Sequence, residues 1–568
     1  MFWAVSGLKK QRERQPRHPR TAFATFDTNQ LRAGLESFRT SIAERLSETL
    51  PLTFEQAFAG VDYGKKGEDF MVALPRFRVP GKVAEIAATI IEGFQPDEWI
   101  ESIIFDRSFL RFRVNTTNMI CKVLNQLKYS SNNSGKGKKV IIEYSSPNII
   151  KEFHLGHLQS TVIGAFLANL YKACGWEVIL MNYLGDWGTQ FSLVATGYEK
   201  YGSQEEYNND PLMHLYNVYI KVTRDVEADP KVKHGWRETS LKKYQEAYNW
   251  LNIKFEVYTG ESNVNKESME KALGQLEHMG LISDREGARE VDLKKWNLMA
   301  PIVRKLDGTS TYIICDIGGA IERYEQYKFD KMIYVVGSAQ DFHLTQFFKV
   351  LELMGFPWAK NLLHIHYRMV QGMSTRKGTA VFLDRIIKKA GDMMHEQMKK
   401  NEDKYAAVED LETMSLEIAI TGIKIQDMAA KQINDYTFNW DRMLSFKGDT
   451  GAYLQYAHAQ LASIGRKNPH LLPLPPASQI AMHTLAQYPR TCEITFLLGT
   501  YPDVVEVALK THEPRGLVHV ILTGWDSVIV KGEEDVQKAR AKMYLYDCAR
   551  EVLAAAMRLL SVRPLERM

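Results

Sequence analysis

The chain is 568 residues long, which at roughly 150 residues per domain predicts three or four folded units. Its hydrophobic content of 45% and charged content of 25% are those of an ordinary soluble globular protein, so a collagen-like, coiled-coil or largely disordered chain is excluded. The formal net charge is only +4, so a nucleic-acid partner would have to be bound by local patches of positive charge.

The five cysteines are scattered and include no CxxC pair, so we predict neither a disulfide framework nor a metal site, and a reducing compartment. No apolar run approaches the roughly 20 residues that cross a bilayer, and we expect no membrane partner. Residues 1–30 are predicted to form a disordered basic tail. The protein is expected in the cytoplasm, with mitochondrial targeting through this tail as the alternative.

Residues 31–130 mix helical periodicity with short β-rich runs at 70–74 and 109–114, which predicts an N-terminal α+β domain. The polar segment 130–137 is rich in Ser, Asn and Gly, residues that favour turns and flexible connections. The first domain boundary is therefore placed there.

A β-branched run at 139–144 leads through a Ser-Ser-Pro-Asn turn into a helical pattern, and a second strand-like run follows at 177–181. This succession predicts a βαβ unit and a Rossmann-type parallel sheet within a domain spanning 138–390. Further strand-like runs stand at 311–314 and 332–336, and a helix-rich insertion is expected at about 195–290.

Long helical patterns dominate residues 391–568 and predict an all-α bundle. The Pro-rich segment 469–476 interrupts this bundle as a surface loop. The predicted fold class is therefore α/β, with an N-terminal α+β domain and a C-terminal helical domain beside the parallel-sheet domain.

Two short segments are suited to bind phosphate. His154 and His157 stand three residues apart at a predicted helix start, with Gly156 between them, and an electropositive helix end favours anions. The segment 372–379 carries hydroxyls and two cations between glycines, as a loop that contacts ATP phosphates would. Taken alone, the histidines could equally be a surface accident or a metal pair, and the basic segment a surface turn.

In its context, His154-Leu155-Gly156-His157 resembles the HIGH signature of class I aminoacyl-tRNA synthetases, and 372–379 resembles their KMSKS loop. Segments 181–191, 435–440 and 448–458 resemble arginyl-tRNA synthetases of the eukaryotic, fungal-like kind, and the resemblance runs from roughly residue 40 to the end. It implies that the N-terminal domain is of the additional tRNA-binding type and that the helical domain is an anticodon-binding domain of the DALR type.

The resemblance also implies which residues bind ATP: His154, Gly156, His157, Met373, Ser374, Thr375, Arg376 and Lys377. Thr375 occupies the place of the usual catalytic lysine of the loop. In many arginyl enzymes a lysine just before the histidine motif supplies that charge, and Lys151 stands there in this chain. The catalytic residues are therefore expected to be His154, His157 and Lys151.

For the amino acid, the resemblance points to Glu143, Asn148, Tyr312, Asp316 and Gln340. Asn148 is expected at the α-amino end and the other four around the side chain. Carboxylates suit this task because they pair with a guanidinium through two parallel hydrogen bonds, which a lysine ammonium cannot make. Each residue alone has an ordinary structural explanation, such as a helix cap for an aspartate after a strand.

The expected function is an arginine–tRNA ligase that uses ATP and Mg²⁺ to activate L-arginine and transfers it to tRNA(Arg), acting as a monomer. Two helical segments, 226–241 and 517–525, look short for the family, and five residues depart from its pattern: Glu152, Gln159, Cys315, Lys447 and Gln460. These departures leave two alternatives open. One is a relative that activates arginine for a non-tRNA acceptor, and the other is a catalytically silent RNA-binding regulator.

Overall fold

The computed structural model describes residues 35–64, 69–126, 132–148, 153–186, 197–198, 200–228, 231–368, 370–371, 383–399, 410–446, 448, 450–521 and 533–568. The predicted basic tail, Lys151 and the segment 372–379 lie outside the described residues.

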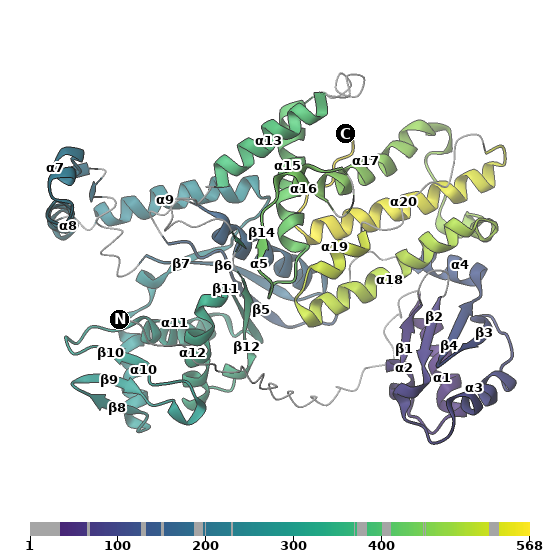
Figure 1. Cartoon of the computed structure of the whole chain (residues 1–568), viewed down its shortest axis with the longest axis horizontal. Coiled ribbons are helices and arrows are strands. Elements are labelled where there is room, and N and C mark those ends of the chain that lie inside the picture. Colours follow the sequence, from purple (N-terminus) through teal and green to yellow (C-terminus); the bar gives the residue numbers. More distant parts are fainter. Residues whose placement is uncertain are drawn as a thin grey trace, which may run out of the picture.

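The N-terminal unit is an antiparallel sheet of order β1-β2-β4-β3 covered by helices. Its elements are α1 (Glu36–Thr49), α2 (Phe54–Ala59), β1 (Val61–Tyr63), β2 (Phe70–Ala73), α3 (Val83–Glu92), β3 (Ile100–Asp106), β4 (Phe109–Val114) and α4 (Thr116–Gln126). It docks on helix α18 (Pro489–Thr511), where Asp503 accepts hydrogen bonds from Arg39 at 3.0 Å and from the Tyr63 hydroxyl at 2.6 Å (Figure 1). The α+β character expected for this segment is present.

The centre of the molecule is a five-stranded parallel sheet of order β12-β11-β5-β6-β7. Its strands are β5 (Lys139–Glu143), β6 (Glu177–Leu184), β7 (Val257–Gly260), β11 (Lys331–Gly337) and β12 (Leu362–Tyr367). Val140 and Ile142 of β5 face the core around helix α5 (Leu155–Ala173), whereas Ile141 faces a second core on the opposite side. Because both faces are covered, the three middle residues of β5 are all apolar, as expected in a buried parallel strand.

The second core is formed by helices and a small antiparallel sheet of order β10-β9-β8. The elements between β6 and β12 are α7 (Gln204–Asn209), α8 (Pro211–Ala228), α9 (Lys231–Trp250), α10 (Lys266–His278), β8 (Ile282–Arg285), β9 (Ala288–Val291), β10 (Ile302–Arg304), α11 (Tyr312–Tyr327) and α12 (Asp341–Leu353). Residues 195–290 thus hold helices but also β7, a strand of the main sheet. The strand expected at 311–314 was wrong, because this segment starts α11 and its buried Ile313 and Ile314 fit a helix as well as a strand.

The C-terminal part is a helical bundle beside the sheet (Figure 1). After β13 (Val370–Gln371), its further elements are α13 (Leu383–Lys399), α15 (Leu411–Met428), β14 (Tyr436–Thr437), α16 (Trp440–Leu444), α17 (Gly451–Lys467), α19 (Arg515–Ile521) and α20 (Val536–Leu559). Strand β13 pairs with β14, so a strand from the bundle lies beside the chain that follows β12. Among the described helices, none is both long and apolar enough to cross a membrane.

Helices α15 and α17 cross at Gly451, and this crossing yields a test of the bundle. A Cβ atom at residue 451 would stand 2.5 Å from the backbone of Thr421 and Gly422 in α15, so Gly451→Ala has to push the helices apart. We expect this variant to lose about 1–3 kcal/mol of unfolding free energy in urea titrations.

Gly465→Ala, in the same helix, is the matched control. There a Cβ would meet only side-chain atoms, the nearest at 3.4 Å. Because alanine favours a helix over glycine, this variant should be neutral or more stable by about 0.5–1 kcal/mol. Equal destabilisation of both variants would contradict the close helix crossing.

Candidate active site

The candidate site lies at the carboxyl edge of the parallel sheet, between β5 and β11. From β5 the chain continues to β6 and β7 on one side, and later returns to β11 and β12 on the other. This reversal of direction opens a crevice outside the carboxyl ends of the two strands, where ligands of such sheets bind.

The two histidines form a stacked pair at the start of α5. Nδ1 of His154 accepts a hydrogen bond from the backbone N–H of Gly156 at 3.1 Å, and Nδ1 of His157 lies 3.5 Å from the backbone N–H of His154 as its acceptor. The rings are 3.9 Å apart with an interplanar angle of 18°. Since both Nδ1 atoms accept, each neutral ring carries its hydrogen on Nε2, the tautomer that can donate to a phosphate oxygen.

Gly156 gives the His154 ring room, because a Cβ at this position would stand 3.0 Å from the ring and would require a small shift of it. The helix start is also held from the sheet, where the Tyr367 hydroxyl at the end of β12 donates to the Gly156 carbonyl at 3.2 Å. The histidine pair is therefore fixed by its own backbone and by a neighbouring strand.

The turn after β5 has an unusual backbone. Ser145 and Ser146 both adopt positive φ angles, 70° and 42°, a region that costs residues with side chains about 1–2 kcal/mol each. Hydroxyl groups of α5 stabilise the turn: the Ser145 N–H donates to Ser160 Oγ at 2.8 Å, and Thr161 donates to Ser145 Oγ at 2.8 Å. Ser160 in turn donates to the Val335 carbonyl of β11 at 2.7 Å, so the turn, the helix and both strands are joined.

Asn148 is held against the end of β6. It forms a bridge with Gly185, and a Cβ at residue 185 would stand 2.0 Å from the Asn148 amide oxygen. The Tyr244 hydroxyl donates to the Asn148 carbonyl at 2.8 Å. The neighbouring Asp186 is buried and accepts from Ser262 at 2.7 and 2.6 Å, so the Gly-Asp pair of the motif packs the turn and places Asn148.

Glu143, at the end of β5, is 5% exposed and pairs with Arg323 of α11 at 2.8 Å. The guanidinium also lies over the Tyr183 ring, 4.5 Å from its centroid. Burial raises the pKa of Glu143, and the Arg323 charge opposes that rise. The guanidinium of Arg323 therefore already balances the negative charge of Glu143.

Asp316 lies on the same helix as Arg323 and close enough to Glu143 to contribute to the raised pKa of that residue. Its carboxylate is 2.7 Å from Nε2 of His343 and its side chain is 26% exposed. Tyr312, one turn earlier on α11, is exposed, and so is Gln340 just after β11. Of the two carboxylates, Glu143 is buried and Asp316 is partly exposed to solvent.

Of the residues expected to bind ATP or arginine, the described ones come from the carboxyl ends of β5 and β11, the loop after β5 and the starts of α5 and α11. Lys151, Met373, Ser374, Thr375, Arg376 and Lys377 lie outside the described residues. Sequence reasoning missed Arg323 and His343. Arg323 follows Asp316 by two helical turns on one face, a spacing that could have indicated it.

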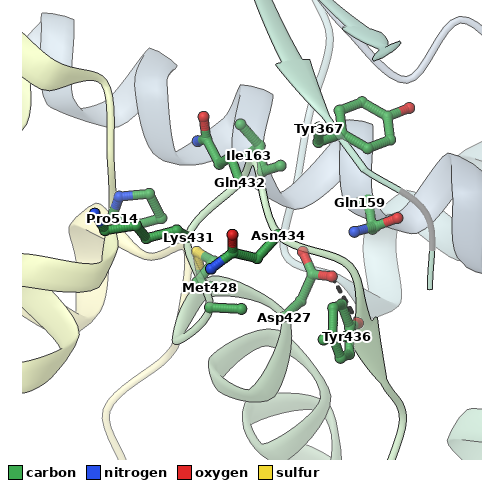
Figure 2. A pocket seen from close by; sticks show the side chains of 11 residues that line it. Gln159, Ile163, Tyr367, Asp427, Met428, Lys431, Gln432, Asn434, Tyr436 and Pro514 are labelled. Carbon is green, nitrogen blue, oxygen red and sulfur yellow. Dashed lines mark hydrogen bonds between the residues drawn. The ribbon is translucent and has the colours of Figure 1, made fainter. Parts of the chain in front are cut away.

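A small pocket lies where α5 meets the bundle, and it contains one of the departures from the family pattern. This residue is Gln159, which faces the buried Asp427 of α15 (Figure 2). The Tyr436 hydroxyl donates to Asp427 at 2.7 Å. Burial raises the pKa of Asp427 to about 6, although hydrogen bonds from Tyr436 and Gln159 oppose the rise.

Comparison with known proteins identifies the family to which this fold belongs. The family of class I (R) tRNA synthetase catalytic domains matches residues 119–242 and 227–440, and the DALR anticodon binding domain matches 454–568. The fold is similar to the arginyl-tRNA synthetase structures of Plasmodium falciparum, with a TM-score of 0.73 at 21% identity, and Thermus thermophilus, with 0.71 at 21%. These alignments cover 94% of this chain and 99% of each structure. The chain is a class I aminoacyl-tRNA synthetase.

Full-length relatives narrow this class. The chain is 42% identical to the cytoplasmic arginine–tRNA ligase of Saccharomyces cerevisiae, over 94% of this chain and 95% of that protein. It is 38% identical to the mitochondrial arginine–tRNA ligase of the same yeast, over 88% and 84%. The chain belongs to the arginine–tRNA ligase family. The predicted resemblance, fold class and enzyme class are confirmed, and neither alternative function gains support from these matches.

The raised pKa of Asp427 has a measurable consequence for stability. A carboxyl group whose pKa is higher in the folded than in the unfolded state binds more protons when folded, so the folded state loses stability as pH rises between the two values. For Asp427 this window runs from about 4 to about 6, and the loss is about 3 kcal/mol. Asp427→Asn should therefore gain about that much relative to the wild type between pH 4 and pH 7, in urea unfolding. A pH-independent difference would mean that Asp427 titrates normally.

Gln159→Arg provides an independent check of the same carboxyl group. A cation at this position would lower the pKa of Asp427 and remove the pH-dependent loss, with no change at Asp427 itself. Its stability relative to the wild type should rise over the same pH window.

Proposed function

We propose that the crevice at the carboxyl edge of the sheet holds MgATP beside L-arginine and forms arginyl-adenylate, which then reacts with tRNA(Arg). The overall activity is that of an arginine–tRNA ligase, and the site residues are the finer part of the proposal. The observation that carries it is the meeting of two unlike groups at one edge. The stacked imidazoles of His154 and His157 stand at the start of α5, and the carboxylates of Glu143 and Asp316 stand at the adjoining strand end and helix.

The first reaction joins the arginine carboxylate to the α-phosphorus of ATP. An oxygen of the carboxylate forms a new P–O bond while the bond to the bridging oxygen of pyrophosphate breaks, and pyrophosphate leaves with that electron pair. No protein nucleophile is needed, so alignment and charge stabilisation supply the catalysis. The Nε2–H donors of His154 and His157 suit the developing charge on phosphate oxygens. Lys151 and Arg376 with Lys377 are proposed to add positive charge from the segments beside the motif and after β13.

The second reaction transfers the arginyl group. A ribose hydroxyl at the end of the tRNA attacks the carbonyl carbon of the adenylate, the hydroxyl proton leaves, and AMP departs. For this step we propose that the helical bundle, with its match to DALR anticodon binding domains, contacts the anticodon and that residues 31–130 contact the tRNA body. The remaining domain boundaries are proposed as 138–390 for catalysis and 391–568 for the bundle.

Selection of arginine follows from the charges at the edge. Arg323 already balances Glu143, so the partly open Asp316 is the carboxylate that an incoming guanidinium would pair with. Tyr312 and Gln340 are exposed at the same edge and suit contacts with the flat guanidinium and its stem. Asn148, fixed by Gly185 and Tyr244, is proposed to meet the α-amino group.

For its setting, we propose a monomer that works in the cytoplasm. Support for the compartment comes from the yeast cytoplasmic relative, which is more similar to this chain than the yeast mitochondrial relative is. Mitochondrial targeting through the basic residues near the N-terminus remains the alternative.

Removing the charge of Asp316 should affect arginine far more than ATP. Asp316→Asn keeps the size of the side chain and its contact with His343 but loses a charge-assisted pair, so we expect the KM for arginine to rise about 10- to 100-fold. The KM for ATP should change less than about threefold, measured by ATP–pyrophosphate exchange.

Asp330→Asn is the matched control, because Asp330 binds the first residue of β5 at the opposite edge of the sheet. It should leave both KM values near those of the wild type. Equal rises for arginine and ATP in Asp316→Asn would remove this residue from the arginine site while leaving the enzyme class intact.

His157→Ala tests the phosphate-facing role of the histidine pair. Loss of one preorganised donor should lower kcat of pyrophosphate exchange about 100- to 1,000-fold. Because His157 is only half-buried, the thermal midpoint should stay close to that of the wild type. His278→Ala, at an exposed position in α10, serves as control. Normal exchange in His157→Ala would end the proposed mechanism.

A further inference from the structure

Three metal-binding side chains meet on the side of β12 that faces α12. Asp341 is the first residue of α12, and His364 and His366 lie two residues apart on β12, so their side chains share one face. One carboxylate oxygen of Asp341 lies 3.5 Å from Nδ1 of His364 and 3.7 Å from Nδ1 of His366. All three donor atoms lie within 4.8 Å of one another.

The protonation of His364 is fixed by its other nitrogen. Nε2 donates a hydrogen bond to the carbonyl of Val336 at 2.9 Å, because a carbonyl oxygen can only accept. The hydrogen of the neutral ring is therefore on Nε2, and Nδ1 carries a lone pair. That lone pair points toward the carboxylate of Asp341.

The carboxylate of Asp341 also has an oxygen atom that lacks a hydrogen-bond donor among the described residues. The side chain of Asp341 is 49% exposed, yet its Oδ1 is buried and receives no hydrogen bond from the residues that the structure describes. Oδ1 is also the atom that faces both imidazoles. Two acceptors, a buried anionic oxygen and a neutral ring nitrogen, thus face one another without a proton between them. Such an arrangement is unfavourable unless a cation lies among the three atoms.

We propose that Asp341, His364 and His366 bind a divalent transition-metal ion, of which Zn²⁺ is the representative. Two imidazoles and one carboxylate are ligands that Zn²⁺ accepts, whereas Mg²⁺ and Ca²⁺ prefer oxygen alone. Ligands about 2.1 Å from a tetrahedral ion are about 3.4 Å apart, close to the two separations from Asp341. The Val336 carbonyl that orients His364 is a partner that metal-binding histidines commonly have.

The site is separate from the proposed chemistry. His364 and His366 point away from α5, since the intervening Ile365 belongs to the core around that helix. The ion would instead fasten the end of β12 to the start of α12, one residue beyond Gln340. Its expected effect is on the stability and placement of this edge of the sheet. The inference holds independently of the residues proposed for ATP and arginine.

An ion pair without metal is the competing explanation. A protonated His366 beside Asp341 would also satisfy the carboxylate, and the start of a helix favours an acidic residue in any case. The two explanations differ in their response to metal and pH. Metal binding requires neutral imidazoles and weakens in acid, whereas the ion pair strengthens as the histidines become protonated.

The test is calorimetric titration of the metal-free, untagged full-length chain with Zn²⁺ at pH 7.5. We expect one ion per chain, and a dissociation constant at least tenfold higher in Asp341→Asn and in His366→Gln. Saturating Zn²⁺ should raise the thermal midpoint of the wild type by a few degrees and leave that of the two variants unchanged. Both changed side chains are about half exposed, so the variants should fold.

His470→Gln, at an exposed position within the segment 469–476, is the control and should bind Zn²⁺ like the wild type. Titration at pH 5.5 should weaken wild-type binding at least tenfold, because the imidazoles must lose protons first. The proposal is overturned if the wild type takes up no Zn²⁺. It is equally overturned if Asp341→Asn and His366→Gln bind the ion as tightly as the wild type, since the ion then sits elsewhere.

Discussion

Glu143 ends the central strand inside the protein, where an unpaired carboxylate would cost several kcal/mol, and Arg323 reaches from α11 to pair with it. This buried pair joins the sheet to the helix that carries Asp316 and Tyr312. Removing either partner would leave the other charge buried, so the pair has to form whenever the edge is assembled. The positions of Asp316 and Tyr312 on α11 therefore depend on the ion pair between Glu143 and Arg323.

The two sides of the crevice are fixed by different means. On the acidic side charges pair across β5 and α11, whereas on the histidine side neutral hydroxyls and backbone groups hold the start of α5. This difference suits the two ligands that we propose for the crevice, arginine and ATP. A guanidinium needs a carboxylate with one charge to spare, and a triphosphate needs neutral donors and cations that do not repel it.

The helical bundle also contacts the carboxyl edge of the parallel sheet. Strand β13 leaves β12 and pairs with β14 of the bundle, and Tyr436 of β14 donates to Asp427, which lies against Gln159 of α5. The segment 372–379 starts directly after β13. A change in the position of the bundle would therefore be transmitted to the chain next to the segments that we propose to bind phosphate. The N-terminal unit is attached to the bundle through Asp503, so it would follow the bundle.

The sequence by itself determined the fold class, the central βαβ unit and the family. It could do so because a buried parallel strand is apolar throughout and because the motifs around His154 and 372–379 are local strings of residues. Its errors were also local: the apolar run at 311–314 fits a buried helix as well as a strand, and the short strand β7 did not stand out among helices. Only the tertiary structure decided that Arg323 balances Glu143, that His343 contacts Asp316, that Gln159 faces Asp427, and that Asp341 joins the histidines of β12. These relations join residues on different elements, and their charges and protonation depend on burial and on distances that no pattern along the chain contains.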